Sequence, residues 1–297
     1  MEIQYFPTLK CNFDCDYCVS HNKIEFSLDE NRRTLFNIFR LFREKQQNGC
    51  LYIVGGEPSL HRNFLDIMHY INILKKTIFP AKIELQTNLS LSKIYDKIDS
   101  VVDSYSVSLH FIELKRKNRL KVFEKNFNKI KNKLYNLDIM LEHGSKDEMM
   151  EEKEFIKHLY SLNPKFVSSE MIYAFYGGYD NKITQEFKDF YEKNSKTKNR
   201  YFGYSTNDLF TLKPSFKGYW CEVGANFYSI LGSGEVLSCA GHYNEWLNGK
   251  KSLGNINNDY KKFITNECTL CDYPDCCGCY YLHRSKEKFN PLEVLDD

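Results

Sequence analysis

The sequence predicts an α/β protein in which strands alternate with helices, followed by a small cysteine-rich α+β extension. From residue 29 to about 200, short apolar runs alternate with longer amphipathic segments. This pattern is typical of β/α units around a parallel sheet, which can close or half-close into a barrel. Farther along, seven cysteines fall between Cys221 and Cys279. We therefore expect two domains, residues 1–200 and residues 201–297.

Six strands are expected in the first domain, each an apolar run bounded by turn residues. They are Ile3–Leu9, Cys50–Val54, Ala81–Gln86, Ser104–Leu109, Ile139–Glu142 and Phe166–Tyr173. Helices are expected at Asp29–Gln46, Asn63–Thr77, Lys117–Leu134, Lys146–Leu159 and Thr184–Asn194. The first helix carries a stripe at helical spacing that predicts core packing, made of Thr34, Leu35, Ile38, Phe39 and Phe42.

Charge and hydropathy limit the partners and the compartment. Lys plus Arg is 41 and Asp plus Glu is 39, a net charge of +2 that gives no electrostatic reason to expect nucleic acid or a membrane surface. The chain has neither a basic-then-apolar signal peptide nor an apolar run of about eighteen residues, so a cytoplasmic protein is expected. In a reducing compartment, clustered cysteines indicate metal rather than disulfides. Cys50 stands apart and is expected to be a buried, inert thiol.

Three cysteines, Cys11, Cys15 and Cys18, follow the first expected strand with the spacing C-x3-C-x2-C. Three thiolates can hold three corners of an iron–sulfur cube or three positions of a zinc ion. The spacing alone leaves both open. A zinc site would need a fourth ligand, for which His21 is the nearby candidate, whereas a [4Fe–4S] cluster would keep one iron free for a small molecule.

This loop, with Tyr17 directly before the third cysteine, resembles the signature of the radical S-adenosylmethionine (SAM) superfamily. The resemblance implies a partial (β/α)6 barrel and a [4Fe–4S] cluster whose open iron binds SAM, with Tyr17 in the cofactor site. It also implies an oxidoreductase that reductively cleaves SAM to methionine and a 5′-deoxyadenosyl radical, which takes a hydrogen atom from the substrate. An electron donor such as flavodoxin or ferredoxin would supply the electron.

Further cofactor residues follow from the same resemblance. Gly55-Gly56-Glu57-Pro58, after the second strand, resembles the family's GGEP motif, whose backbone and acid receive the methionyl ammonium of SAM. Short polar side chains at the ends of the next two strands resemble positions that reach the ribose and carboxylate of SAM. These are Thr87, Asn88, Ser106 and Ser108.

The catalytic residues are not identified by the sequence, and the candidates are His110, Glu142 and Cys276. An aspartate is common in the family where this chain has His110, so a structural role competes with a catalytic one. Glu142 and His143 close the fifth strand and Glu170 lies in the sixth, where each could contact SAM or substrate. The polar run from Lys193 to Arg200 is expected to be a linker.

The extension begins with an expected β-hairpin. Phe227–Leu231 and Glu235–Ser238 flank a glycine turn, which brings Cys221 and Cys239 side by side, so both can meet one metal. This C-x12-G-x4-C pattern resembles the auxiliary-cluster hairpin of radical SAM proteins with a SPASM or twitch extension. Cys268, Cys271 and Cys277 fit the SPASM spacing C-x2-C-x5-C, whose fourth position is Tyr281, with Cys279 the nearest thiol.

The cysteine count leaves the number of auxiliary [4Fe–4S] clusters open. Two clusters held only by cysteine need eight thiols and one needs four, whereas the extension has seven. One cluster, or two with an open or non-cysteine position, therefore fit, and a zinc ribbon is the structural alternative. Because Cys276 adjoins Cys277, it is either a packed thiol or a group near substrate that returns a hydrogen atom.

Two classes of substrate are expected from the resemblance. The first is a ribosomally made peptide or protein, modified by a crosslink, a thioether or an epimerisation. The second is a small molecule such as an amino sugar, oxidised or rearranged. No leader-peptide-binding domain is expected ahead of the first strand. Because many enzymes that modify peptides carry one, the peptide and small-molecule interpretations become more equally supported. A non-catalytic cluster-binding protein is the remaining alternative, and the intact cysteine and GGEP motifs argue against it.

Overall fold

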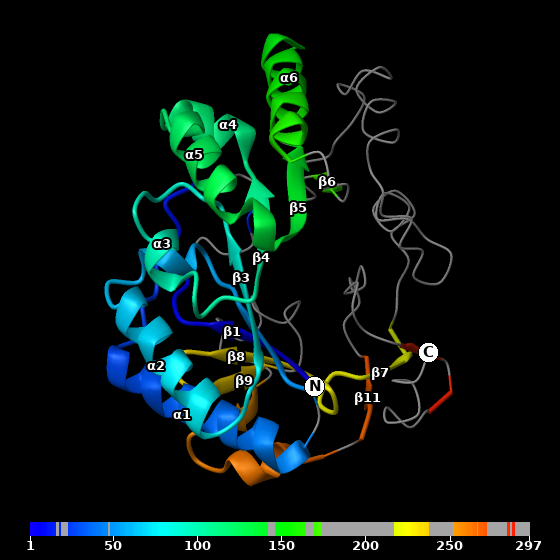
Figure 1. Ribbon diagram of the computed structural model, residues 1–297. Coiled ribbons are helices and arrows are strands. Elements are labelled where there is room, and N and C mark those ends of the chain that lie inside the picture. Colours follow the sequence, from blue (N-terminus) through cyan, green and yellow to red (C-terminus); the bar gives the residue numbers. More distant parts are fainter. Residues whose placement is uncertain are drawn as a thin grey trace.

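A curved sheet forms the centre of the computed structural model, which describes residues 1–15, 18, 23–46, 48–141, 146–163, 169–173, 217–237, 252–265, 267–271, 284–285 and 287–288 (Figure 1). Its first six strands are β1 (Glu2–Phe6), β2 (Cys50–Ile53), β3 (Lys82–Thr87), β4 (Ser104–Leu109), β5 (Leu134–Leu141) and β6 (Ser169–Tyr173). They pair in this order and all in parallel. The partial barrel of six parallel strands expected from the sequence is confirmed.

The same sheet continues on the other side of β1 with strands from the last third of the chain. These are β8 (Phe227–Leu231), β9 (Glu235–Leu237) and β10 (Ser252–Asn255). β8 lies parallel to β1, with Glu2 opposite Phe227 and Phe6 opposite Leu231. β8 and β9 form the expected antiparallel hairpin, and β10 pairs antiparallel with β9. The hairpin is therefore part of the central sheet.

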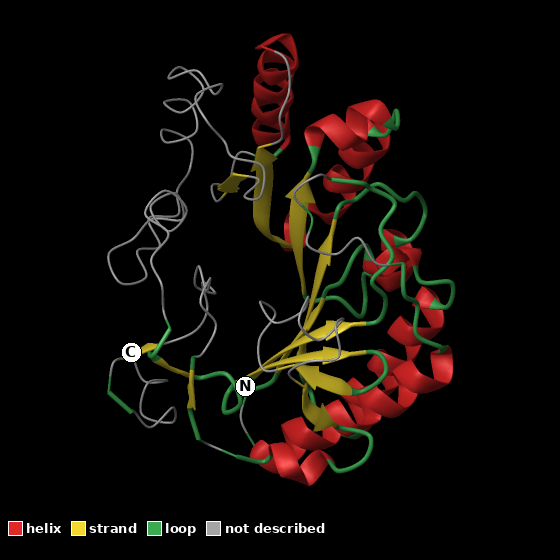
Figure 2. Ribbon diagram, turned by 180° about the vertical axis from the view of Figure 1, so that it is seen from behind, coloured by secondary structure: helices red, strands yellow, loops and turns green. Residues whose placement is uncertain are grey.

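The helices lie along one face of this sheet (Figure 2). They are α1 (Leu28–Lys45), α2 (Phe64–Thr77), α3 (Tyr95–Ile98), α4 (Phe111–Arg116), α5 (Leu120–Ile130) and α6 (Lys146–Leu162), with short 3-10 turns at η1 (Pro58–Leu60), η2 (Lys131–Lys133) and η5 (Tyr260–Phe263). The stripe predicted for α1 is buried. Ser27 and Glu30 form a capping box at its N-terminus.

One predicted helix was wrong in its extent. The segment Lys117–Leu134 contains α5, η2 and the first residue of β5, and the separate helix α4 precedes it. Asn118 adopts a left-handed backbone with φ of 54°, which ends α4 before α5 begins. Leu134 is extended and pairs with Tyr105, so β5 starts five residues earlier than predicted. The predicted helix Thr184–Asn194 lies outside the described residues.

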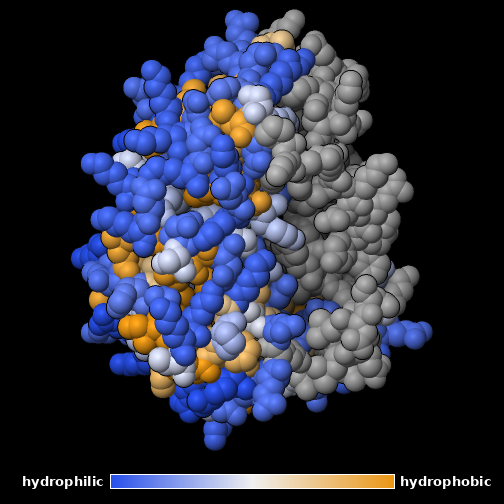
Figure 3. Space-filling model, in the orientation of Figure 1, coloured by the Kyte–Doolittle hydropathy of each residue, from blue (hydrophilic) through white to orange (hydrophobic). Residues whose placement is uncertain are grey.

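On the face seen in Figure 3, the described residues are largely hydrophilic, with apolar side chains scattered among them. Phe36, Leu65 and Ile73 are exposed on α1 and α2, while the buried stripes of these helices pack on the sheet. In the described part of the chain, no helix is both long and apolar enough to cross a membrane.

We predict that Gly234→Ala, in the hairpin turn, destabilises the fold more than Gly218→Ala. Both glycines have a left-handed φ, 90° and 85°, so alanine carries a similar backbone cost of about 1 kcal/mol at either position. Only at Gly234 would the added Cβ collide with the side chain of Asn257, because nothing lies within 4 Å of it at Gly218. Urea unfolding of both variants measures the difference, and equal losses would show that Asn257 does not restrain the turn.

Candidate cofactor site

A cavity of about 230 Å³ lies where the carboxyl ends of the central parallel strands meet. Loops that follow neighbouring parallel strands gather at one edge of a sheet, so residues far apart in sequence converge here. The lining residues are Cys11, Phe13, Cys15, Cys18, Gly55, Gly56, Gln86, Thr87, Asn88, Ser108, His110 and Met140. The structure thus brings the three cysteines of the first motif together with the glycine pair and the polar ends of β3 and β4.

The glycine pair after β2 lets two backbones approach closely. A Cβ on Gly55 would collide with the carbonyl of Thr8, and one on Gly56 with the carbonyl of Lys10. The approach lets Glu57 N donate to Lys10 O at 2.7 Å, one residue before Cys11. These glycines therefore set the path of the cysteine loop, in addition to leaving room for a ligand.

The Glu57 carboxylate, which the sequence assigned to the SAM ammonium, accepts hydrogen bonds from the chain itself. It is 1 % exposed and does not line the cavity. Its donors are Asn88 N at 2.7 Å, Ser59 N at 3.1 Å, the Ser59 hydroxyl and the Thr87 hydroxyl at 3.0 Å. Burial raises its pKa, which these donors oppose. The side chain thus ties the GGEP turn to the end of β3.

A triangle of amide and hydroxyl groups fixes the cysteine loop to the end of β3. Asn88 Nδ2 donates to Asn12 Oδ1 at 3.1 Å, Asn12 Nδ2 donates to Ser90 Oγ at 2.7 Å, and Ser90 Oγ donates to Asn88 Oδ1 at 2.6 Å. Asn88 Nδ2 also lies 4.0 Å from the sulfur of Cys11. Asn88 therefore holds the cysteine loop in place and also lines the cavity.

The cysteine loop also contacts α4 and the residue that joins it to β4, His110. The sulfur of Cys15 lies 3.5 Å from His110 Nδ1, and the Phe13 ring packs edge-on against the His110 ring with centroids 5.5 Å apart. Asp14 N donates to Glu113 Oε2 at 3.1 Å. These contacts place His110 against a cysteine of the first motif, at the wall of the cavity.

The donor set fits an iron–sulfur cluster with one open position. Three thiols line one cavity, beside glycine backbone and small polar side chains that suit a polar ligand. Burial raises the pKa of the Cys11 thiol to about 11. Within the described ranges, no three Cys, His, Asp or Glu side chains form a group that could hold a single metal ion. The site is therefore identified by the cavity that the three thiols share.

Some residues selected from the sequence lie elsewhere. Ser106 is buried on β4 but does not line the cavity. Glu170 pairs with Asp138 across β5 and β6, and its side chain is not described. The predicted positions outside the described residues are Tyr17, His21, Glu142, His143, Cys239, Cys276, Cys277, Cys279 and the linker at 193–200.

Three cavity residues were not selected from the sequence, namely Phe13, Gln86 and Met140. Gln86 pairs with Ser106, and Met140 lies two residues after Asp138, the partner of Ser108, so both point to the same face of the sheet as these serines. The two-residue alternation of strands β3 and β5 could have identified them.

Three cysteines of the extension lie on or directly beside the strands of a second, three-stranded sheet. Cys221 lies on β7 (Trp220–Cys221), between β11 (Thr269–Leu270) and β12 (Arg284–Ser285). Cys221 pairs with Thr269, and Cys268 and Cys271 stand directly before and after β11. Burial, together with charge on the nearby Glu222 and Cys221, raises the pKa of Cys268 to about 11. This sheet therefore brings the backbone positions of the three cysteines close in the fold, and none of them lines the first cavity.

Comparison with known proteins finds a family for the first half of the chain. Residues 5–152 match the model of the "Radical SAM superfamily". A GTP 3′,8-cyclase of Helicobacter pylori is 27 % identical over 173 residues, which is 52 % of this chain and 52 % of that protein. The chain thus spans about half the length of this curated relative.

Solved structures share the fold over most of the chain. Streptococcus suis SuiB bound to S-adenosylmethionine has a TM-score of 0.57 at 15 % identity, covering 89 % of this chain and 65 % of SuiB. The structure of anSMEcpe with bound AdoMet has a TM-score of 0.58 at 17 % identity, covering 89 % of this chain and 79 % of anSMEcpe. These likenesses support the fold seen here.

We predict that Glu57→Gln destabilises the protein in the absence of any ligand. The amide would place an NH2 group against donors such as Asn88 N and Ser59 N, at a cost of about 1.5–3 kcal/mol in unfolding free energy. Chemical unfolding without SAM, and calorimetric titration of SAM into the cluster-loaded protein, separate the two roles. Unchanged stability with weakened SAM binding would instead show that the carboxylate acts on the SAM ammonium.

Proposed function

The chain belongs to the radical SAM superfamily, and we propose that it is an enzyme of that kind, which binds a [4Fe–4S] cluster and SAM in the cavity after β1. The observation that carries this proposal is the convergence of Cys11, Cys15 and Cys18 with Gly55 and Gly56 on one cavity. When bound, the cluster and SAM supply a 5′-deoxyadenosyl radical that removes a hydrogen atom from the substrate.

The residues of the chain hold and orient these groups. The three cysteines provide the cluster ligands, and the backbone at Gly55 and Gly56 provides close access for the methionyl end of SAM. The side chains of Thr87, Asn88 and Ser108 offer hydrogen bonds along the cavity wall. Phe13 and Met140 line the same wall with apolar surface, which helps to exclude water from a reactive site.

For the substrate we propose a peptide or protein, modified by crosslinking, thioether formation or epimerisation. Two solved structures that share the fold support this choice, because SuiB is known bound to the precursor peptide SuiA and anSMEcpe with the peptide Cp18Cys. The alternative is a small molecule, which the similarity to GTP 3′,8-cyclase favours over about half of the chain. A short precursor-peptide reading frame beside the gene, encoding a peptide that the protein modifies, would decide for the first. A crosslink or thioether is detected as a loss of mass, and an epimerisation, which leaves the mass unchanged, by chiral amino-acid analysis.

We also propose that residues 201–297 bind one or two auxiliary [4Fe–4S] clusters. The candidate ligands are Cys221, Cys239, Cys268, Cys271, Cys277 and Cys279. The gathering of Cys221, Cys268 and Cys271 around β7 and β11 supports this. A zinc ribbon remains the alternative for the same cysteines.

We predict that the anaerobically reconstituted protein releases 5′-deoxyadenosine and methionine when it is reduced with dithionite and given SAM. Replacing Cys11, Cys15 and Cys18 together by alanine abolishes this release and removes about four iron atoms per chain, the content of one cube. Iron bound by the extension stays. Iron analysis and chromatography of the products measure both effects.

Cys50→Ala is the matched control for this experiment. Cys50 lies on β2, half-buried and outside both cysteine groups, and burial raises its pKa to about 11. Its removal should leave iron content and 5′-deoxyadenosine unchanged. The proposal fails if the triple variant keeps all its iron, or if the unmodified protein holds only zinc.

A further inference from the structure

The buried face of α1 carries a row of polar side chains beside its apolar stripe. Asn31, Thr34 and Asn37 follow one another at intervals of three residues, and all three are buried. Buried polar groups lower stability unless they are hydrogen-bonded. The partners of this row connect two distant parts of the chain, the cysteine loop and the C-terminal hairpin.

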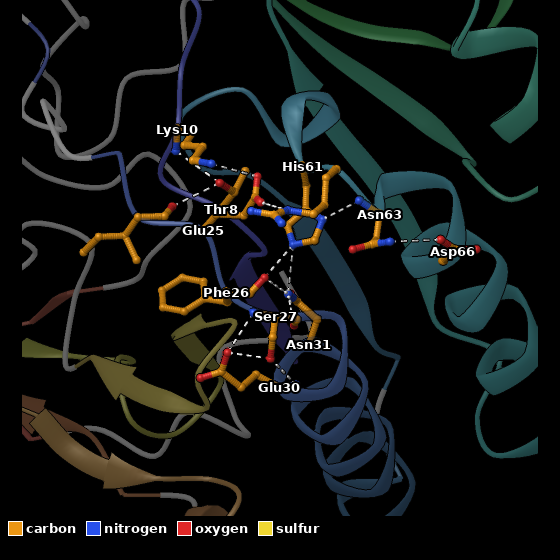
Figure 4. Close-up of polar contacts among 12 residues, drawn as sticks. Thr8, Lys10, Glu25, Phe26, Ser27, Glu30, Asn31, His61, Asn63 and Asp66 are labelled. Atoms are coloured by element: carbon orange, nitrogen blue, oxygen red, sulfur yellow. Dashed lines mark hydrogen bonds and ion pairs between the residues drawn. The ribbon is translucent and has the colours of Figure 1, made fainter.

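Asn31 holds the segment where the cysteine loop returns to the sheet. Its Nδ2 donates to the carbonyl of Phe26 at 3.2 Å and to that of Ser27 at 2.8 Å (Figure 4). Its Oδ1 accepts from the hydroxyl of Tyr5. Asn31 and Tyr5 have no exposed surface. One side chain thus joins β1, where the loop begins, to the segment where the loop ends.

His61 reaches the same carbonyl from the turn after β2. Its Nδ1 accepts from Asn63 N at 3.0 Å, which leaves the proton on Nε2, and Nε2 lies 2.7 Å from Phe26 O (Figure 4). We assign this tautomer from the backbone donor on Nδ1. Asn31 Nδ2 and His61 Nε2 are then both donors, so their 3.3 Å approach is no hydrogen bond and both converge on Phe26 O.

The two stems of the loop are bound to each other beside this carbonyl. Leu9 N donates to Ile24 O at 2.8 Å, and the Thr8 hydroxyl donates to the same carbonyl at 3.1 Å. Glu25 accepts from Lys10 Nζ at 3.3 Å and pairs with Arg62 (Figure 4). A displacement of Phe26 therefore moves the return stem, and with it the strand end that leads into Cys11.

The other end of the polar row binds the hairpin turn. The Thr34 hydroxyl donates to Gly232 O at 2.9 Å and accepts from Asn257 Nδ2 at 2.9 Å, and Asn37 Nδ2 donates to Asn257 Oδ1 at 3.1 Å. Gly232 itself fits against the loop, because a Cβ there would lie 2.7 Å from the Phe26 ring and 2.8 Å from Asn31 Oδ1.

We propose that Asn31 and His61 are positioning residues, which lock the base of the cysteine loop through the Phe26 carbonyl. They do not line the cavity, so their effect on SAM binding acts through the loop, and this effect on SAM rests on the proposed function. The hairpin turn lies beside them, because Gly232 is bound by Thr34 and packs against Phe26.

The first test is amide hydrogen exchange of the reconstituted protein, read by mass spectrometry in peptides that contain Leu9. In Asn31→Leu and His61→Leu, we expect this amide to exchange at least tenfold faster, because the stem that carries Ile24 O is released. His61→Gln keeps a donor for Phe26 O and an acceptor for Asn63 N, so it should exchange as the unmodified protein does.

Ser27→Ala is the control for a loss of helix stability. It removes the capping box at the same end of α1, an effect of about 1 kcal/mol, and leaves the bonds to Phe26 O intact. Its Leu9 amide should exchange at most twofold faster. If Asn31→Leu and His61→Leu match Ser27→Ala, the positioning role is overturned, whether or not the protein binds a cluster.

The second test follows SAM binding by the change it makes in the electron paramagnetic resonance spectrum of the reduced protein. The spectrum of the triple cysteine variant is subtracted to remove the extension's signal. We expect at least tenfold weaker SAM binding in both leucine variants and at most twofold in Ser27→Ala. Normal SAM binding with fast exchange would restrict the role to loop stability, and absence of the signal from unmodified protein would refute the proposed function instead.

Discussion

The close approach of two backbones, from the end of β1 and from the turn after β2, is the constraint on which the site depends. Only glycine allows it, since a Cβ at position 55 or 56 would strike a carbonyl of the β1 stem. The approach allows Glu57 N to donate a hydrogen bond to Lys10 O. The Glu57 carboxylate in turn accepts hydrogen bonds from residues at the end of β3. Loops after three successive strands thereby become one unit around the cysteines.

Much of this unit could be predicted from the sequence, because its motifs are local. The cysteine spacing, the glycine pair and the ends of β3 and β4 each follow an apolar run, and parallel strands bring such ends to one edge. The hydrogen-bond donors around the Glu57 side chain could not be predicted. Whether a carboxylate faces a ligand or the chain depends on which donors surround it, and Asn88 N is more than thirty residues away in sequence.

The polar row on α1 shows a second limit of the sequence. The spacing predicts Thr34 as part of the core stripe, and it is buried as expected, but periodicity shows only that a position faces inward. It does not show that the Thr34 hydroxyl donates to the carbonyl of Gly232 and accepts from Asn257. The split between α4 and α5 was missed for a related reason, because the left-handed turn at Asn118 interrupts a run whose composition is helical throughout.

The direction of β8 explains how a late segment of the chain reaches an early motif. Because β8 runs parallel to β1, its carboxyl end lies at the same edge as the cysteine loop, and Gly232 N donates to Phe6 O there. β9 runs back and β10 returns, so Asn255 and Asn257 meet the turn at this edge. An antiparallel β8 would have placed the turn at the far edge. Addition of a parallel strand beside β1 therefore gives the extension direct contact with α1 and with the base of the cysteine loop.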